Sequence, residues 1–270
     1  MEHAGTLLRR WRNERNLSQM QLGLNAEISA RHISFIETGR ARPGRGVLLV
    51  LASQLDIPLR ERNLILQAAG YPPAYRETDL ATPEMKEVRE TLSLVLEHHQ
   101  PYPAVVTNVG GDILQSNQAG SRLVELACQD SEAVLEDGPP NIYRVLTHPG
   151  GVRRHMKNWE NVVSQILYRA DKEAGIEQNQ VLGEVLESIR RYPDVPGPEF
   201  DPTRSSSLLI PIVFDLDGRV IRFLSTIASL GTAIDITLLE LRVETWFPAD
   251  KQSSANWLAI VDELSAKQCK

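Results

Sequence analysis

The sequence is poor in cysteine, since Cys128 and Cys269 are the only two among its 270 residues. Two thiols are too few for a disulfide framework or a cysteine-based metal cluster, and we interpret both as unreactive. Histidines do not replace them, because the adjacent His98 and His99 would diverge by about 100° on a helix and bind one ion poorly. We therefore expect no metal site.

Long apolar runs and catalytic motifs are also missing. No stretch approaches the roughly 18 apolar residues needed to cross a bilayer, and the N-terminus lacks the charged-then-apolar pattern of a signal peptide. The sequence contains no Gly-rich phosphate loop, Cys-x-x-Cys pair, His-Glu-x-x-His motif or nucleophile elbow. We expect a cytoplasmic protein without a membrane partner, catalytic residues or a cofactor.

Lysine is absent from the first 76 residues, yet this part of the chain is basic. It holds 11 arginines and 6 acidic residues, a net charge of +5, whereas the other 194 residues hold 18 basic and 29 acidic residues, a net charge of −11. The apolar fraction of 42% is typical of a folded globular protein. A basic head on an acidic body favours attraction to phosphates at one end of the chain.

Apolar residues in the N-terminal part recur at helical spacing, as Leu7, Leu8 and Trp11 do in the first segment. Serine and proline residues mark the starts of several helices, because a serine hydroxyl can cap a helix and proline suits its first turn. The pattern predicts five short helices between residues 6 and 69, the later four beginning near Ser18, Ser29, Gly46 and Pro58.

The second and third of these helices have the spacing of a helix-turn-helix. The turn falls at Glu27–Ile28, and the third helix ends at Thr38–Gly39 before an arginine-containing loop. Such a motif places its second helix in the major groove of double-stranded DNA. The alternative, an ordinary pair of surface helices with scattered arginines, leaves the coincidence of caps, spacing and charge unexplained.

Several side chains of this motif have the chemistry for DNA contacts. Gln19 and Ser29 stand at helix N-termini, which favour phosphate binding. Arg31 has the reach and the planar fork for a guanine edge. The arginines past the third helix would contact the backbone and hold the register, and they are Arg40, Arg42 and Arg45.

This part of the chain, about residues 5–69, resembles the Cro and phage-repressor type of helix-turn-helix, also called the Xre type. The shared pattern is Ser18-Gln19, Ile33 to Gly39 and Arg40 to Pro43. The resemblance implies phosphate contacts at Gln19, Ser29, Thr38 and Arg42, and base contacts at Ala30, Arg31 and Phe35. With His32, on an outer face of the third helix, the predicted DNA-binding residues are Gln19, Ser29, Ala30, Arg31, His32, Phe35, Thr38, Arg40, Arg42 and Arg45.

Two positions depart from the pattern of this family. Glu27 stands where glycine is usual, which predicts a residue with positive φ and a strain of about 1 kcal/mol. Phe35, at a base-reading position, has no hydrogen-bonding group. It either touches a thymine methyl group or packs against the following loop, and we favour packing.

The remainder of the chain has a mixed pattern. Three prolines between residues 70 and 83 indicate a linker, and we predict a helix-turn-helix domain at residues 1–70, a linker at 71–82 and a second domain at 83–270. Helices are predicted at 83–99, 117–128, 141–147, 151–174, 179–192 and 255–266. Strands are predicted at 103–107, 112–116, within 207–229 on both sides of a tight turn at 215–218, and at 239–247.

The last strand alternates two sets of side chains, with Leu241, Val243, Thr245 and Phe247 on one side and Arg242, Glu244 and Trp246 on the other. Residues 28–77, 103–120 and 237–250 are similar to transcription regulators that carry an MmyB-like ligand-binding domain. This resemblance implies a PAS-like sensor fold over about residues 83–266. We therefore expect an all-α five-helix head followed by an α+β domain with an antiparallel sheet.

PAS-like sheets commonly leave a cavity between the sheet and its helices, and the composition of this chain predicts an apolar cavity. Our hypothesis is a pocket for a small hydrophobic effector such as a fatty acid or another acyl chain. The residues expected to line it are Trp159, Val163, Ile166, Leu186, Ile212, Phe214 and Phe223. Arg153-Arg154 and Arg190-Arg191 are either solvated helix faces or an anion-binding rim for a ligand carboxylate.

Together these patterns favour a sequence-specific, one-component transcription regulator, with a DNA-binding head and a sensor domain. We expect a homodimer, because one helix-turn-helix covers only a half-site. The alternative is a DNA-tethered protein-interaction module without a small-molecule ligand, which would need a large exposed apolar patch in place of an enclosed cavity.

Overall fold

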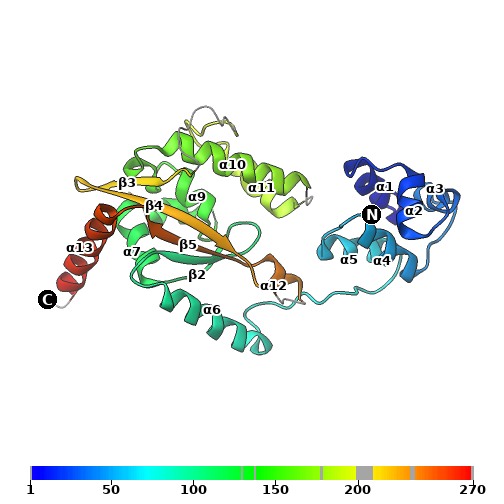
Figure 1. The fold of residues 1–270 in the computed structure, drawn as a ribbon, viewed down its shortest axis with the longest axis horizontal. Helices are drawn as coiled ribbons and strands as arrows, with labels where there is room; N and C mark the ends of the chain where they lie inside the picture. Colours follow the sequence, from blue (N-terminus) through cyan, green and yellow to red (C-terminus); the bar gives the residue numbers. More distant parts are fainter. Residues whose placement is uncertain are drawn as a thin grey trace. The chain divides into compact units, whose positions relative to one another are not determined.

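The computed structural model describes residues 2–128, 130–136, 138–176, 179–198, 209–231 and 235–268. The chain divides into two compact units (Figure 1). The first, the head, consists of Met1–Thr78 with Ala233–Leu238, and the second, the C-terminal unit, of Asp79–Thr232 with Leu239–Lys270. Each unit has a hydrophobic core of its own, the physical mark of a domain.

Five α-helices form the head within residues 2–78. They are α1 (Ala4–Glu14), α2 (Gln19–Ala26), α3 (Ala30–Glu37), α4 (Arg45–Gln54) and α5 (Leu59–Ala68). Their apolar sides meet in one core, in which Trp11 and Ile36 are fully buried. The predicted five-helix head is confirmed.

Capping side chains set the starts of α2 and α3. Ser18 accepts a hydrogen bond from the backbone N–H of Gln21, and the Gln21 side chain accepts one from the backbone N–H of Ser18, which completes a capping box. Ser29 accepts a hydrogen bond from the backbone N–H of His32. Both helix starts therefore follow the prediction.

The turn between α2 and α3 contains the predicted left-handed residue. Glu27 has φ 56° and ψ 35°, a conformation that glycine adopts freely and that costs other residues about 1 kcal/mol. The Glu27 side chain is exposed, so the cost is confined to the backbone. The prediction of a positive φ at this position is confirmed.

The chain after α5 remains attached to the head through Asn63. The Oδ1 atom of Asn63 accepts hydrogen bonds from the backbone N–H groups of Ala74 and Tyr75 at 2.9 and 3.1 Å, and its Nδ2 donates to the Tyr75 carbonyl at 2.8 Å. The Tyr71 hydroxyl donates to the Pro43 carbonyl at 3.1 Å. Both tyrosines thus belong to the head.

A short returning segment completes the head. The Asp235 carboxylate accepts hydrogen bonds from the backbone N–H and the hydroxyl of Thr78, at 3.3 and 2.7 Å. The backbone N–H of Ile236 donates to the Arg76 carbonyl at 2.9 Å. Ile236 is buried and begins α12 (Ile236–Glu240).

The described part of the C-terminal unit is built on an antiparallel five-stranded sheet in the order β2-β1-β5-β4-β3. Pairs β1–β2 and β3–β4 are hairpins, and β5 joins them by pairing with β1 and β4. The strands are β1 (Ala104–Thr107), β2 (Ile113–Ser116), β3 (Ile212–Leu216), β4 (Arg219–Ala228) and β5 (Arg242–Pro248). The predicted α+β fold with an antiparallel sheet is confirmed.

Helices cover both faces of this sheet. Figure 1 shows α6 on one side and α9, α10 and α11 on the other. None of the helices in the described ranges is long and apolar enough to cross a membrane. The helical elements are η1 (Pro83–Met85), α6 (Lys86–His98), α7 (Gln118–Ala127), α8 (Ser131–Glu136), α9 (Ile142–Thr147), η2 (Val152–His155), α10 (Trp159–Ile176), α11 (Gln180–Ile189) and α13 (Lys251–Gln268).

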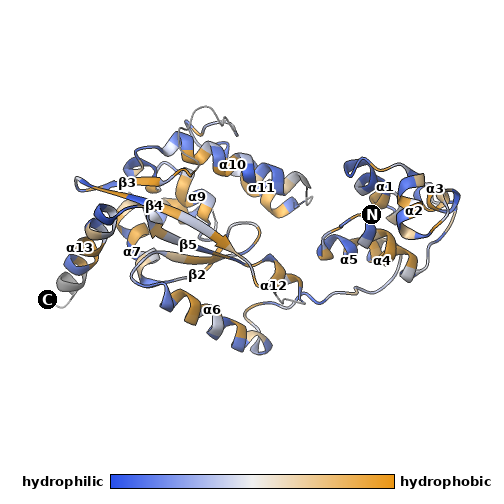
Figure 2. Ribbon diagram, in the orientation of Figure 1, coloured by the Kyte–Doolittle hydropathy of each residue, from blue (hydrophilic) through white to orange (hydrophobic). Residues whose placement is uncertain are grey.

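The face of the sheet toward α9 and α10, the inner face, carries the largest aromatic side chains. Phe214, Phe223 and Trp246 are buried there, with the Trp246 ring centroid 6.2 Å from that of Phe214 and 5.9 Å from that of Phe223. Figure 2 shows apolar residues on the central strands and on the neighbouring sides of the helices. This face therefore holds the main core of the unit.

Some helix boundaries differ from the predictions. The helix predicted at 151–174 is interrupted, because Met156 forms a bridge with Phe214 and Asn158 bonds to the backbone of β3, so α10 begins at Trp159. The C-terminal helix begins earlier than predicted, because Asp250 accepts a hydrogen bond from the backbone N–H of Ser253 and caps it. The short α8 and α12 were not predicted.

Gly5 of α1 allows a close approach to α3. A Cβ atom at this position would lie 2.0 Å from the Ile36 carbonyl oxygen, whereas one at Gly46 of α4 would meet nothing within 4 Å. We expect Gly5→Ala to destabilise the head by about 1–3 kcal/mol, since a packed backbone contact must open. The control Gly46→Ala should be neutral or stabilising by up to about 1 kcal/mol.

Hydrogen exchange of peptides from α1 and α3, followed by mass spectrometry, measures both changes within the intact chain. Faster exchange in Gly5→Ala alone is the expected result. Unchanged protection in that variant would show that α1 and α3 are not in this close contact.

Candidate DNA-binding surface and ligand cavity

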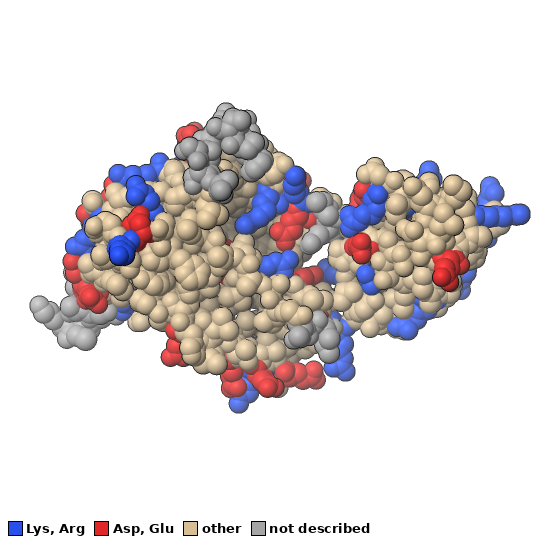
Figure 3. Space-filling model, in the orientation of Figure 1, with Lys and Arg blue, Asp and Glu red and all other residues tan. Residues whose placement is uncertain are grey.

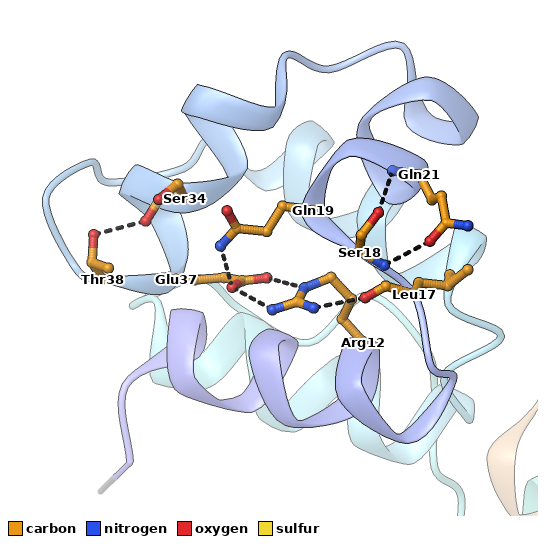
Figure 4. A network of polar contacts seen from close by, with 8 residues as sticks. All are labelled: Arg12, Leu17, Ser18, Gln19, Gln21, Ser34, Glu37 and Thr38. Carbon is orange, nitrogen blue, oxygen red and sulfur yellow. Dashed lines mark hydrogen bonds and ion pairs between the residues drawn. The ribbon is translucent and has the colours of Figure 1, made fainter.

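A buried ion pair joins α1 to α3 beneath the helix-turn-helix (Figure 4). The Nε and Nη2 atoms of Arg12 donate to the two carboxylate oxygens of Glu37 at 2.7 and 2.9 Å, and Nη1 donates to the Leu17 carbonyl at 2.7 Å. The two side chains are only 10% and 2% exposed. This two-pronged contact fixes the C-terminal end of α3 against α1.

Gln19 belongs to the same network. Its Nε2 atom donates to Oε2 of Glu37 at 2.8 Å, which holds the side chain at the start of α2 (Figure 4). One amide N–H of Gln19 is therefore used within the protein, and no other bond of this amide group is seen among the described residues. The predicted phosphate contact at Gln19 stays a prediction.

Arg31 and Phe35 form a pair on α3. Arg31 is exposed and Phe35 is half-buried, and the Arg31 Cζ atom lies 5.4 Å from the centroid of the Phe35 ring. A guanidinium over an aromatic face is attracted by the ring electrons. Phe35 thus packs against Arg31, the predicted base-reading side chain, and a contact of Phe35 with DNA stays a prediction.

The other predicted DNA-binding residues lie at the surface of the head or close to it. Ser29, Thr38, Arg40, Arg42 and Arg45 are exposed, and Ala30 and His32 are half-buried. The Thr38 hydroxyl donates to the Ser34 carbonyl at 2.7 Å, and Arg42 makes a long 3.4 Å bond to the Ala69 carbonyl. Figure 3 shows basic side chains on several sides of this unit.

A cavity of about 290 Å³ lies in the C-terminal unit, on the inner face of the sheet. Helices α9 and α10 supply one wall, and β1, β3, β4 and β5 supply the other. Its apolar lining includes Ile142, Leu146, Ile166, Ile212 and Trp246. The volume is near the lower end of the range of small-molecule sites, roughly 300–1,000 Å³.

Two smaller or more open spaces adjoin this cavity. A narrow pocket of about 40 Å³ with an almost entirely apolar lining shares Ile142, Leu146, Glu244 and Trp246 with it. A more open hollow of about 380 Å³ shares Ile166, Arg169, Ile212 and Ser225. An apolar ligand portion therefore has room beyond the cavity itself.

The inner face of β5 brings charged groups into the cavity. Arg242 and Glu244 line it beside Trp246, and the Trp246 Nε1 atom donates to Glu244 at 2.8 Å. Arg242 forms an ion pair with Glu173 of α10 at 3.4 Å. The predicted apolar lining thus describes only part of the cavity.

Glu244 is half-buried and lines the cavity. Its burial raises the pKa of the carboxyl group, while hydrogen bonds from Trp246 and Ser225 and the positive charge of Arg169 act in the opposite direction. Burial also raises the pKa of the Tyr143 hydroxyl, which lines the same cavity, to about 12.

Arg169 lies on the same side of α10 as Ile166 and Glu173, at spacings of three and four residues. It is exposed and lines both the cavity and the adjoining hollow. Within the described ranges, Arg169 makes no hydrogen bond or ion pair. Its guanidinium is therefore available to an anion.

The predicted ligand-contacting residues fall into two groups. Ile166 and Ile212 line the cavity, and Phe214 lines the narrow pocket. The others do not line these three spaces: Phe223 belongs to the main core, Val163 and Leu186 to the core between α10 and α11, and Trp159 packs against both cores.

The charged members of the cavity were not predicted. Alternation along β5 placed Arg242 and Glu244 beside Trp246 but did not show which face would be covered. Neither Arg153 nor Arg190 lines any of these three spaces. Arg153 donates to the Pro193 carbonyl, and Arg190 pairs with Asp171.

Other reactive groups are few in the described part of the chain. No cluster of His, Cys, Asp and Glu suited to a metal ion occurs there. Burial raises the pKa of the Cys128 thiol to about 11, so this thiol stays protonated at neutral pH. Cys269 lies outside the described residues.

The raised pKa of Glu244 predicts a pH-dependent stability. The folded chain binds the Glu244 proton more tightly than the unfolded chain does, so this stabilising contribution is present at low pH and is lost as the pH rises through the raised folded value. Arg169 and Glu173 from α10, Tyr143 from α9, and Arg242 from β5 line the cavity with it.

We expect Glu244→Gln to remove this loss and to gain thermal stability relative to the wild type as the pH rises above the ordinary range of a glutamate. Thermal unfolding over a pH series measures the effect, and Glu125→Gln, on the exposed side of α7, is the matched control. If the unfolding temperatures of the wild type and Glu244→Gln changed with pH in parallel, the raised pKa of Glu244 would be contradicted.

Comparison with known protein families agrees with both units. The family described as helix-turn-helix domain matches residues 3–65, and the family described as MmyB-like transcription regulator ligand binding domain matches residues 88–259, more than half of the chain. No curated protein matches the sequence. The chain therefore belongs to the MmyB-like transcription regulators, with a helix-turn-helix domain followed by a ligand-binding domain.

Proposed function

We propose that this regulator is a one-component sensor whose C-terminal unit binds a small, largely apolar effector such as a fatty acid or another acyl chain. The observation that carries this proposal is the cavity on the inner face of the sheet, with Ile142, Leu146, Ile212 and Trp246 in its lining. It lies within the residues that match the ligand-binding family.

The head binds operator DNA through α3 and its flanking groups. Arg31 reads a base edge from the exposed side of α3, with its guanidinium held over Phe35. The loop arginines Arg40, Arg42 and Arg45 and the N-terminal ends of α2 and α3 contact phosphates. The net charge of +5 on residues 1–76 supports this orientation.

The regulator is cytoplasmic. It acts on DNA as a homodimer, because a single helix-turn-helix covers only one half-site. Effector binding changes the spacing or freedom of the two heads, with a coupling free energy of about 1–3 kcal/mol. No reaction is assigned to the C-terminal unit, whose role is recognition.

Two head variants distinguish base reading from phosphate binding. Arg31→Ala should cost roughly 1–3 kcal/mol on the preferred operator and relax the preference at one base position. Arg42→Ala should weaken all sequences alike and reduce the salt dependence of binding by about one phosphate contact.

Selection of bound DNA from a random pool supplies the operator. Fluorescence anisotropy with that operator and its single-base variants, over a series of salt concentrations, then measures both effects. An equal loss on every sequence in both variants would overturn the base-reading role of Arg31.

The effector proposal is tested on the purified full-length protein. We expect native mass spectrometry to show a bound small molecule, and solvent extraction to release an acyl compound. Added dodecanoic acid should replace it and raise the thermal unfolding temperature, since a ligand that binds only the folded state stabilises it. A protein that neither carries nor takes up such a ligand would instead favour a DNA-tethered protein-interaction module.

A further inference from the structure

A cavity for an apolar chain alone has no use for charged groups in its lining. Burying a carboxyl group is unfavourable unless the group is hydrogen-bonded or paired, and Glu244 receives hydrogen bonds from the Trp246 N–H, at 2.8 Å, and from Ser225. Its remaining capacity to accept hydrogen bonds faces the cavity that it lines. The polar end of a ligand could use that capacity.

The two arginines that line the cavity differ in how much of the guanidinium remains free to bind a ligand. Arg242 pairs with Glu173 at 3.4 Å and donates to the Leu239 and Leu241 carbonyls at 2.9 and 3.4 Å. Arg169 has no such partner in the described part of the chain, and its charge acts on Glu244. An anion entering the cavity therefore meets one unused guanidinium and one carboxyl group that is desolvated by the surrounding protein.

We propose that the cavity selects an amphiphile by its polar end, with a carboxylate bound to Arg169 and an adjacent hydroxyl or amide N–H donating to Glu244. The apolar remainder lies against Leu146, Ile212 and Trp246 and extends toward the narrow apolar pocket. This inference rests on the proposed effector-binding function. The ligand class is an acyl carboxylate with a second hydrogen-bond donor close to the carboxylate, as in hydroxy fatty acids and N-acyl amino acids.

The electrostatics of the cavity are compatible with such a ligand. Two carboxylates side by side would repel each other. Burial favours the protonated form of Glu244, and Arg169 contributes a positive charge to the same region, so the repulsion on a bound carboxylate is reduced. Tyr143 adds a hydroxyl group to the lining.

Four ligands with the same twelve-carbon chain separate the contributions of the apolar chain, the carboxylate and the second hydrogen-bond donor to binding. They are 1-dodecanol, dodecanoic acid, 3-hydroxydodecanoic acid and N-dodecanoylglycine. Their affinities for the delipidated full-length protein are measured by calorimetry. We expect dodecanoic acid to bind about tenfold more tightly than dodecanol, as for a charge-assisted hydrogen bond. The two ligands with a second donor should bind several times more tightly again.

Variants assign each preference to one side chain. Arg169→Gln should make dodecanoic acid and dodecanol equal, whereas Arg154→Gln, which removes an exposed charge outside the cavity, should not. Glu244→Met should abolish the extra affinity for ligands with a second donor and leave the preference for dodecanoic acid over dodecanol. Glu125→Met on α7 is its control, and Glu244→Gln, which keeps an acceptor oxygen, should retain part of the advantage.

The possible outcomes separate this inference from the proposed function. Equal binding of all four ligands by the wild type would overturn the selection of a polar end and leave the apolar effector site standing. If Arg169→Gln still preferred the carboxylate and Glu244→Met still preferred the second donor, the roles assigned to these two side chains would be overturned. Failure of all four ligands to bind, with no molecule in native mass spectrometry, would overturn both.

Discussion

The two-residue repeat of β5 is the constraint on which the C-terminal unit depends. Trp246 is held between the rings of Phe214 and Phe223, and a shift of one residue would turn it out of the core. Because side chains alternate along a strand, Arg242 and Glu244 must face the same side as Trp246. The helical layer cannot close over these charges with apolar groups alone, so Glu173 pairs with Arg242 and a cavity remains above Glu244.

The head depends on a comparable internal contact, with a different effect. The buried Arg12–Glu37 pair adds little net stability, because desolvation offsets much of the attraction between its charges. Its two parallel hydrogen bonds fix the direction of α3, and the Gln19 amide is held by the same carboxylate. Any DNA contact from α2 or α3 is thus made from a surface that is ordered before binding, which lowers the entropy cost of recognition.

Local sequence signals made the helices of the head predictable. The cavity lacks such signals, so its lining was predicted only in part. The hydroxyl groups of Ser18 and Ser29 cap the helices that follow them within three residues, so sequence alone located α2 and α3. Alternation in β5 separated Trp246 from Phe247, but both residues are aromatic and only tertiary packing decides that Phe247 is the exposed one. Likewise, Val163 and Leu186 lie on apolar helix faces, and such a face does not show whether it meets another helix or a cavity.

Glu244 indicates that the cavity has a role other than packing. Its burial opposes ionisation and so reduces the free energy of unfolding near neutral pH. A leucine at this position would continue the apolar surface of Leu146 and Ile212 without that cost. The hydrogen bonds from Trp246 and Ser225 use only part of the accepting capacity of the carboxyl group, and Glu244 lines the cavity. A polar group that destabilises the fold while lining a binding-sized space is better explained by ligand recognition than by structure.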